Sequence, residues 1–357
     1  MCDSLDFEIV RLYSWLMKHR IPALIGVLAL VMTPAFSQAT TAAAKAKTAA
    51  AVKTWTPPRT PDGQPDLQGI WSNATITPLE RPAQLAGKDV FTEKEAVEYE
   101  KQTLANVNRD RRDGGAKADL DRAYNDGWYD SGTKVVKTRR TSLVIDPPDG
   151  RIPRFTPEAQ KKEEARAEDR RRRPDPADSW EDRSLGERCL TRGAPKLPGG
   201  YNNNFQIVQT PGFVAILQEM IHEVRTIPLD GRPHVDKSIR QWLGDSRGRW
   251  EGSTLVVDTT NYSGRIIFNA FNCCRGSGAN LHIVERFTRV DADTIDYQYT
   301  VDDPATYTRP WTVSLPMTKT EGPIYEYACH EGNYGMANLL SGHRAEEKAA
   351  AEAANNR

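Results

Sequence analysis

The stretch LHIVERFTRVDADTIDYQYTV, residues 281–301, decides the fold. In its second half Ile295, Tyr297, Tyr299 and Val301 alternate with polar residues. Because successive side chains of a strand point to opposite faces, these four side chains share one face. The turn residues 291–293 separate this run from the preceding apolar run. The stretch therefore predicts an antiparallel hairpin that has one face in a core.

Similar short apolar runs continue from about residue 205 to 328, with turn residues such as Pro211-Gly212 and Asp230-Gly231 between them. Many short strands with frequent turns are typical of a β-barrel or a β-sandwich. Gly69-Ile70-Trp71 opens the β-rich part, as a Gly-x-Trp opens the first strand of lipocalin-like barrels. We therefore predict a mainly β fold, an antiparallel calycin-like (lipocalin-like) barrel, and keep a β-sandwich as the alternative.

The chain is expected to form one β-rich domain over residues 61–336, with peripheral helices. Charged, helix-prone segments are inserted at about 91–123 and 156–173, and the second has Thr156 as N-cap and Pro157 at the first helical position. Residues 337–357 are expected to form a C-terminal helix or tail.

The N-terminus has the pattern of a secretory signal peptide. Lys18 to Arg20 precede an apolar run from Ile21 to Met32, and the small residues Ser37 and Ala39 follow it. We assign residues 1–39 to the signal, with Met17 as a possible start, and residues 40–60 to a linker. The protein is therefore expected to be exported, periplasmic or extracellular, with no membrane span after signal removal.

Export changes the interpretation of the cysteines, because disulfides persist in oxidising compartments. Cys2 is removed with the signal, which leaves Cys189, Cys329 and the adjacent Cys273 and Cys274. A disulfide between neighbouring residues is strained, so we expect Cys189 to pair with Cys329. The role of Cys273 and Cys274 is left open.

Composition and motifs exclude several function classes. Lys plus Arg and Asp plus Glu are both 48, so no basic field attracts nucleic acid. The sequence contains no H-E-x-x-H, C-x-x-C, G-x-S-x-G or phosphate-binding glycine motif. The oligomeric state is not indicated by the sequence.

Several segments resemble a large family of exported bacterial proteins of unknown function. The resemblance rests on TPDGQPDLQGIW (60–71), YNNNFQIVQTPG (201–212), IPLDGRPH (227–234) and EYACHEGNYG (326–335), and it covers nearly all of the mature chain. It implies one continuous, exported, β-rich unit and carries no activity, cofactor or substrate. The chain departs from the family pattern at NAFNCCRGSG (269–278).

Histidines on predicted strands are the main candidates for chemistry. His222, His282 and His330 converge if a barrel turns their strand faces inward, and imidazole is a common metal ligand. Hydrogen-bonded, non-ligand histidines are the favoured interpretation, and a divalent metal held by these three residues is the alternative. On an ideal strand His222 shares a face with Gln218 and Met220, opposite Glu219.

The enzyme hypothesis assigns acid–base or metal-ligand roles to His222, His282 and His330, with Glu219 as base and Arg225 as anion holder. A structural ion pair of Arg225 with Glu219 or Glu223 competes with that role. Substrate contacts are expected from residues near the predicted turns: Tyr201, Asn203, His234, Glu331 and Tyr334. The asparagines around Asn203 suit a tight turn first and hydroxyl binding second.

The predicted function is thus an exported enzyme acting on a small molecule, a lyase, hydratase or hydrolase, with an aromatic-lined pocket. The alternative is a non-catalytic calycin-like protein that binds a small ligand in the periplasm.

Overall fold

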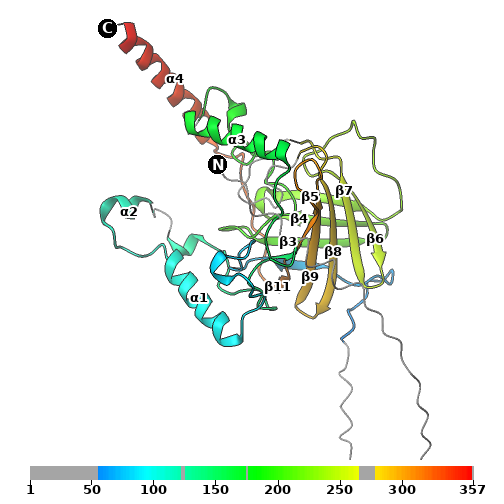
Figure 1. Cartoon of the computed structure of the whole chain (residues 1–357). Coiled ribbons are helices and arrows are strands. Elements are labelled where there is room, and N and C mark those ends of the chain that lie inside the picture. The colour runs from blue at the N-terminus through cyan, green and yellow to red at the C-terminus, as the bar shows by residue number, and fades with distance from the viewer. Residues whose placement is uncertain (1–54, 122–124, 174–175, 265–277, 356–357) are drawn as a thin grey trace, which may run out of the picture. The chain divides into compact units, whose positions relative to one another are not determined.

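The computed structural model describes residues 55–121, 125–173, 176–264 and 278–355 (Figure 1). The predicted signal peptide, Cys273 and Cys274 lie outside these residues. The described residues from Trp55 onward form one compact unit.

The described residues form an 11-stranded sheet whose strand ladders are all antiparallel. The strands are β1 (Gly69–Ser72), β2 (Val144–Asp146), β3 (Asn204–Thr210), β4 (Phe213–Gln218), β5 (Glu223–Pro228), β6 (Asp245–Glu251), β7 (Thr254–Thr260), β8 (His282–Asp291), β9 (Thr294–Asp302), β10 (Trp311–Ser314) and β11 (Met317–Thr320). The prediction of a mainly antiparallel β fold is confirmed.

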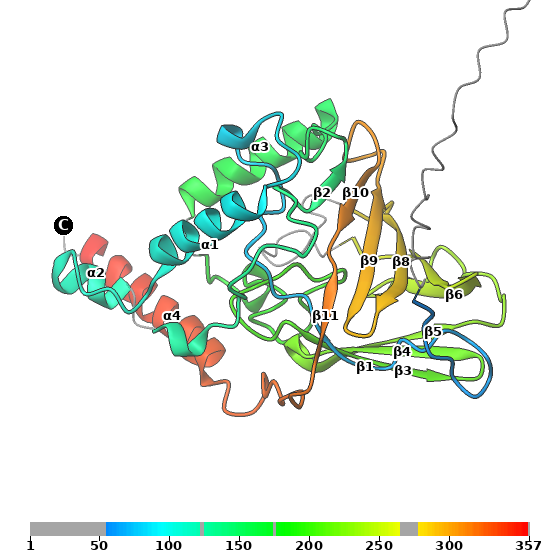
Figure 2. The same cartoon turned by 90° about the horizontal axis from the view of Figure 1, so that it is seen from below.

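The strand order is β5-β4-β3-β1-β11-β9-β8-β7-β6, with β10 joining β9 to β2. No ladder between β5 and β6 closes this order within the described residues, so the structure does not show the predicted barrel. In both views β3 and β4 run across β8 and β9 (Figures 1 and 2). One sheet that folds over itself in this way fits the alternative prediction, a β-sandwich.

The hairpin β8–β9 has the predicted alternation. Ile295, Tyr297, Tyr299 and Val301 are all buried, and Phe287 of β8 stacks on Tyr297 with ring centroids 4.5 Å apart. Trp71 is fully buried, and its indole nitrogen donates a hydrogen bond to the carbonyl of Leu67. The core therefore lies between the two crossing parts of the sheet.

Four α-helices of the described residues lie to one side of the sheet in both views (Figures 1 and 2). They are α1 (Glu93–Val107), α2 (Gly115–Asp121), α3 (Pro157–Arg172) and α4 (Tyr334–Asn355). The helix α3 begins as predicted, because the Thr156 side chain accepts a hydrogen bond from the amide of Ala159. The C-terminal helix is confirmed and begins three residues before the expected position.

A buried ion pair joins the two parts of the sheet. Arg225 of β5 binds the Glu285 carboxylate of β8 with two nitrogens, with Nη2 2.9 Å from Oε1, and the Tyr297 hydroxyl donates to the same Oε1 at 2.7 Å. Glu285 is 0% exposed. Burial lowers the pKa of Arg225, but the charge and the hydrogen bonds of Glu285, together with the nearby tyrosines, outweigh burial, so the net direction of the pKa is upward. Arg225 is thus a structural residue, and its partner is neither Glu219 nor Glu223.

The space around this pair is too small for a ligand. A cavity of about 20 Å³ is lined by Lys196, Glu223, Arg225, Phe287 and Tyr297, among others. This volume holds roughly one water molecule, whereas small-molecule sites typically occupy about 300–1,000 Å³. The cavity beside this pair is therefore too small to be the predicted aromatic-lined pocket.

Breaking the buried pair should destabilise the protein strongly. Arg225→Met leaves the Glu285 carboxylate buried without its counter-ion, so we expect a loss of about 3–5 kcal/mol in the free energy of unfolding. The double variant Arg225→Met/Glu285→Leu should recover part of that loss, because no charge stays unpaired. Urea denaturation followed by tryptophan fluorescence measures both.

The control is Arg249→Met, which removes the arginine of the exposed Arg249–Glu251 pair of β6 and should change stability little. Equal losses for Arg225→Met and Arg249→Met would contradict a special role for the buried pair.

Candidate functional site

Glu219 and His222 lie in a turn where the sequence predicted a continuous strand. The strand β4 ends at Gln218, and residues Met220–His222 form a 3-10 turn before β5 begins. Ile221 and His222 have φ values of 60° and 44°, which is uncommon for residues with a side chain. The predicted sharing of one face by Gln218, Met220 and His222 is therefore wrong at this point, because the turn breaks the alternation.

The carboxylate of Glu219 is occupied by donors of the protein itself. It is 3% exposed, accepts hydrogen bonds from the side-chain amide of Asn204 at 2.9 Å and from the backbone of Tyr325 at 3.2 Å. Hydrogen bonds to a buried carboxylate satisfy its oxygens and fix the neighbouring chain segments. Glu219 ties the start of β3 to the segment that leads to the C-terminal helix.

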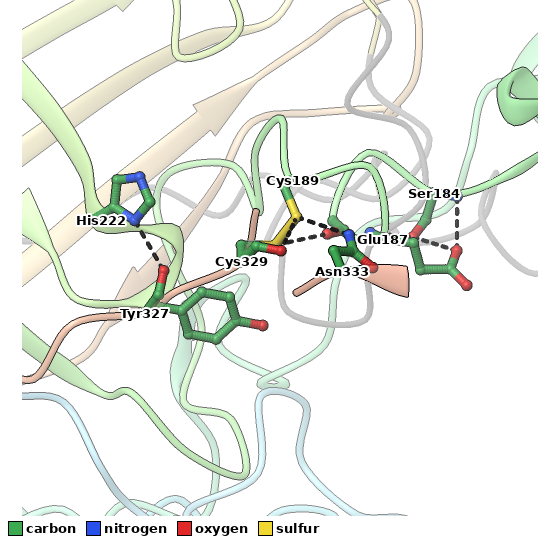
Figure 3. Close-up of a disulfide and its surroundings, with 8 residues drawn as sticks. Ser184, Glu187, Cys189, His222, Tyr327, Cys329 and Asn333 are labelled. Carbon is green, nitrogen blue, oxygen red and sulfur yellow. Dashed lines mark hydrogen bonds between the residues drawn. A yellow bond between two sulfur atoms is a disulfide. The ribbon is translucent and has the colours of Figure 1, made fainter. Parts of the chain in front are cut away.

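His222 and Cys329 make separate contacts with the rest of the chain. Nδ1 of His222 lies 3.0 Å from the carbonyl oxygen of Tyr327, whereas Cys329 forms a disulfide with Cys189, with Cα atoms 5.7 Å apart. Figure 3 shows the imidazole facing the Tyr327 carbonyl and Asn333 beside the disulfide. The predicted disulfide is confirmed.

The remaining C-terminal candidates are exposed and do not meet the other histidines. His330 and Glu331 lie in the exposed turn before α4, and Tyr334, the first residue of α4, is 74% exposed. Within the described ranges, no group of three ligand atoms within 4.8 Å of one another contains His222, His282 and His330. The structure therefore does not bring the three proposed metal ligands together.

Asn203 has a structural role with an unexpected partner. Its side chain is 0% exposed; Oδ1 accepts hydrogen bonds from Nζ of Lys196 and from the backbone of Gly199, each at 2.8 Å. Lys196 is 2% exposed, and burial lowers its pKa to about 8, against the opposing charges of Glu219 and Asp130. The turn role of Asn203 is therefore supported, and Lys196 was missed because a lone lysine carries no motif.

Tyr201 lines a broad cleft of about 1,200 Å³ between the end of α1 and the loops around residues 129–133 and 200. Tyr129 lines the same cleft, and the guanidinium of Arg109 lies 4.1 Å from the centre of its ring. Aromatic rings beside a cation are common in sites that bind planar or sugar ligands. Tyr201 therefore lines a cleft, and its role in ligand binding stays a prediction.

His234 and His282 belong to one chain of hydrogen-bonded side chains. Nδ1 of His234 lies 2.9 Å from Oδ2 of Asp245, and its Nε2 lies 2.9 Å from Oδ1 of Asp258. The other Asp258 oxygen, Oδ2, lies 3.0 Å from Nε2 of His282. The order along the chain is thus Asp245, His234, Asp258, His282, and we call these four residues the Asp–His chain.

Strand register places the Asp–His chain on the outer face of the sheet. Asp258 of β7 pairs with Arg247 of β6 and with Val284 of β8, and His282 shares the face of Val284. The alternate residues Ile283 and Glu285 are buried. His282 therefore points away from the core, and 36% of its side chain is exposed. Its ring also contacts the carboxylate of Asp258.

Asp245 anchors the inner end of the Asp–His chain. Asp245 is 8% exposed at its side chain, and it accepts hydrogen bonds from Nη1 of Arg247 at 2.7 Å and from the backbone of Val235 at 3.1 Å. Within the described residues, Nδ1 of His282 has no hydrogen-bond partner. A ring held at Nε2 and free at Nδ1 can accept a proton from a bound molecule.

These contacts shift the pKa values of Asp258 and His282 in opposite directions. The hydrogen bond from His282 lowers the pKa of Asp258, and the same hydrogen bond raises the pKa of His282 against the effect of burial. Asp258 is therefore ionised near neutral pH and accepts hydrogens from both imidazoles. This geometry resembles the base-and-orienter pair of many hydrolytic sites.

The sequence prediction included His234 and His282 but not their carboxylate partners. Asp258 directly follows the apolar run Leu255–Val257, and Asp245 begins β6, so both have the appearance of ordinary strand-end residues. One signal in the sequence could have identified this contact. Asp258 lies on an outer-face position of the strand that precedes the strand of His282.

Comparison with protein-family models, with curated proteins and with solved structures found no match for this chain. No helix in the described ranges is both long and apolar enough to cross a membrane.

The carboxylate of Asp258 should control the titration of His282. We expect His282 to titrate above pH 6.5 in the wild type and closer to 6.5 in Asp258→Asn, because the ionised partner is removed. Proton NMR of the ring hydrogens over pH 4 to 9 measures this, with Glu251→Gln as a carboxylate control outside the chain. Identical titrations of His282 in the wild type and Asp258→Asn would contradict the contact.

The same pair predicts a pH window for stability. The raised pKa of His282 contributes stability that is complete below pH 6.5 and is lost as the pH rises through the pKa of His282 in the folded protein. The lowered pKa of Asp258 contributes stability that is lost as the pH falls below 3.8. The stability difference between wild type and Asp258→Asn should therefore be largest between these two pH values. A difference that grows steadily above pH 8 would contradict it.

Reduction of the disulfide should destabilise the protein, because it frees a loop with a sequence separation of 140. We expect a loss of about 2–4 kcal/mol in the free energy of unfolding on reduction. The variant Cys189→Ser/Cys329→Ser should show a comparable loss and no further change with reductant. If reductant destabilises that variant as much as the wild type, another thiol is responsible.

Proposed function

We propose that the protein is an enzyme in which His282 transfers a proton in hydrolysis, hydration or elimination of a small molecule. The observation that carries the proposal is the Asp–His chain, with three contacts of 2.9–3.0 Å. A half-buried imidazole with one nitrogen held by a carboxylate is the arrangement of a general base.

The mechanism begins with His282 in the form that donates Nε2–H to Asp258. In this tautomer the lone pair of Nδ1 takes a proton from water or from an acidic C–H of the substrate. For hydrolysis, the resulting hydroxide attacks the electrophilic atom and the proton on Nδ1 passes to the leaving group. Asp258 stabilises the imidazolium that exists between these two steps, as the carboxylate does in catalytic triads.

His234 and Asp245 position Asp258. Both nitrogens of His234 face carboxylates, and the two contacts are hydrogen bonds when both nitrogens carry hydrogen. Asp245 in turn is fixed by Arg247 and by the chain at Val235. Such support holds the reacting ring in one orientation, which an acid–base group on an open surface requires.

The alternative is a ligand-binding protein that uses the cleft of Tyr129, Tyr201 and Arg109. Its support is the size of the cleft, about 1,200 Å³, with aromatic and polar side chains in its wall. Binding without turnover that is lost in Tyr201→Ala and kept in His282→Gln would favour this alternative.

We further propose that the protein is exported and that its sheet is a calycin-like barrel. The disulfide supports an oxidising compartment. A barrel is supported by Gly248 of β6, where a Cβ atom would approach Ile227 of β5 to 2.8 Å, so the two edge strands pack closely. Membership of the family of exported proteins that the motifs resemble stays a proposal as well.

Activity should depend on the free nitrogen of His282. We would screen the full chain against chromogenic carboxylic esters, phosphate esters and glycosides. Whichever substrate is turned over, His282→Gln should lower kcat/KM by about 10²- to 10⁴-fold, the usual worth of a general base. The rate should rise with pH through a value above 6.5, because the base must be unprotonated.

Asp258→Asn should lower the rate and move this pH profile downward, and Glu251→Gln, a carboxylate outside the Asp–His chain, should leave both unchanged. Full activity in His282→Gln would show that the reaction does not use this residue.

A further inference from the structure

A second cluster of metal-ligating side chains lies at α4, away from the Asp–His chain. Nε2 of His343 is 2.9 Å from Oδ1 of Asp178 and 3.7 Å from Oε1 of Glu347. His343 and Glu347 are one helical turn apart on α4, whereas Asp178 lies in the segment before the 3-10 turn Trp180–Asp182. One ligand atom from each of the three residues lies within 4.8 Å of the other two.

The second polar atom of each ligand faces another residue. Oδ2 of Asp178 pairs with Arg173, and Oε2 of Glu347 lies 3.1 Å from Nε of Arg344. Nδ1 of His343 faces Oε2 of Glu346 at 3.8 Å. Outer partners of this kind orient metal ligands, and the remaining atom of each residue lies in the cluster, close to the other two.

We propose that Asp178, His343 and Glu347 bind a divalent transition-metal ion, with Zn²⁺ as the best fit. Zinc bonds to nitrogen and carboxylate oxygen are about 2.0–2.2 Å, so neighbouring ligand atoms of a tetrahedral site lie about 3.3–3.5 Å apart. The separations of 2.9 and 3.7 Å bracket this value. Three protein ligands leave the fourth position for water or a ligand molecule.

The ion would join α4 to the segment around Asp178. No residue of α4 is buried. Besides the cluster, Arg344 donates a hydrogen bond to the carbonyl of Ala177 at 3.2 Å, so the helix and this segment are already neighbours. This site shares no residue with the predicted set of His222, His282 and His330, and it does not depend on the proposed acid–base function.

Isothermal titration of the untagged full chain with Zn²⁺, after chelator treatment, tests the site. Because Cys273 and Cys274 are additional ligand candidates, the titration is run in the Cys273→Ser/Cys274→Ser background. We expect one ion per chain, and His343→Gln or Glu347→Gln should weaken binding by at least about 10- to 100-fold. Hydrogen exchange at residues 343–347 should slow when Zn²⁺ is added.

Two variants serve as controls. Glu352→Gln changes an exposed carboxylate elsewhere on α4, and His330→Gln removes an exposed histidine outside the cluster. Both should bind Zn²⁺ like the parent. Absence of binding by the parent, or equal affinity in His343→Gln and in the parent, would overturn the proposal.

Discussion

The buried contact between Arg225 and Glu285 is the constraint on which the rest of the structure depends. The two residues belong to strands far apart in the sheet order, so their contact requires the sheet to fold over itself. A buried charge is tolerated only when it is paired and hydrogen-bonded, and here Tyr297 supplies the additional donor. The crossing of β3 and β4 over β8 and β9 is thus fixed by polar as well as apolar contacts.

This constraint also determines where the candidate site lies. Because Glu285 must face inward, the alternation of β8 turns His282 outward, to the face that Asp258 shares across the β7–β8 ladder. The cavity beside the buried pair is only about 20 Å³, whereas the Asp–His chain lies at the outer face of the sheet. On this outer face, the ring of His282 is oriented by its contact with Asp258, which His234 and Asp245 support in turn, and not by burial in the core.

Much of the fold could be predicted from local patterns, and the site only in part. Alternation at Ile295–Val301 gave the correct strand and face, and Thr156-Pro157 gave the start of α3. Around Ile221 the predicted alternation of strand faces is wrong. The positive φ of this β-branched residue interrupts the strand, and a pattern of apolar residues does not indicate such a backbone conformation. The partner of Arg225 is 60 residues away, and Asp258 is 24 residues from both histidines. Such long-range pairings depend on the tertiary fold, which local patterns do not specify.

In the proposed mechanism, Asp258 holds His282 at Nε2 and leaves Nδ1 available as a base. Long-range ¹H–¹⁵N correlation spectra of the histidine rings, recorded above the pH at which His282 titrates, report which nitrogen carries hydrogen. We expect hydrogen on Nε2 and a lone pair on Nδ1 of His282. A neutral ring with hydrogen on Nδ1 would contradict the contact with Asp258 and the proposed mechanism together.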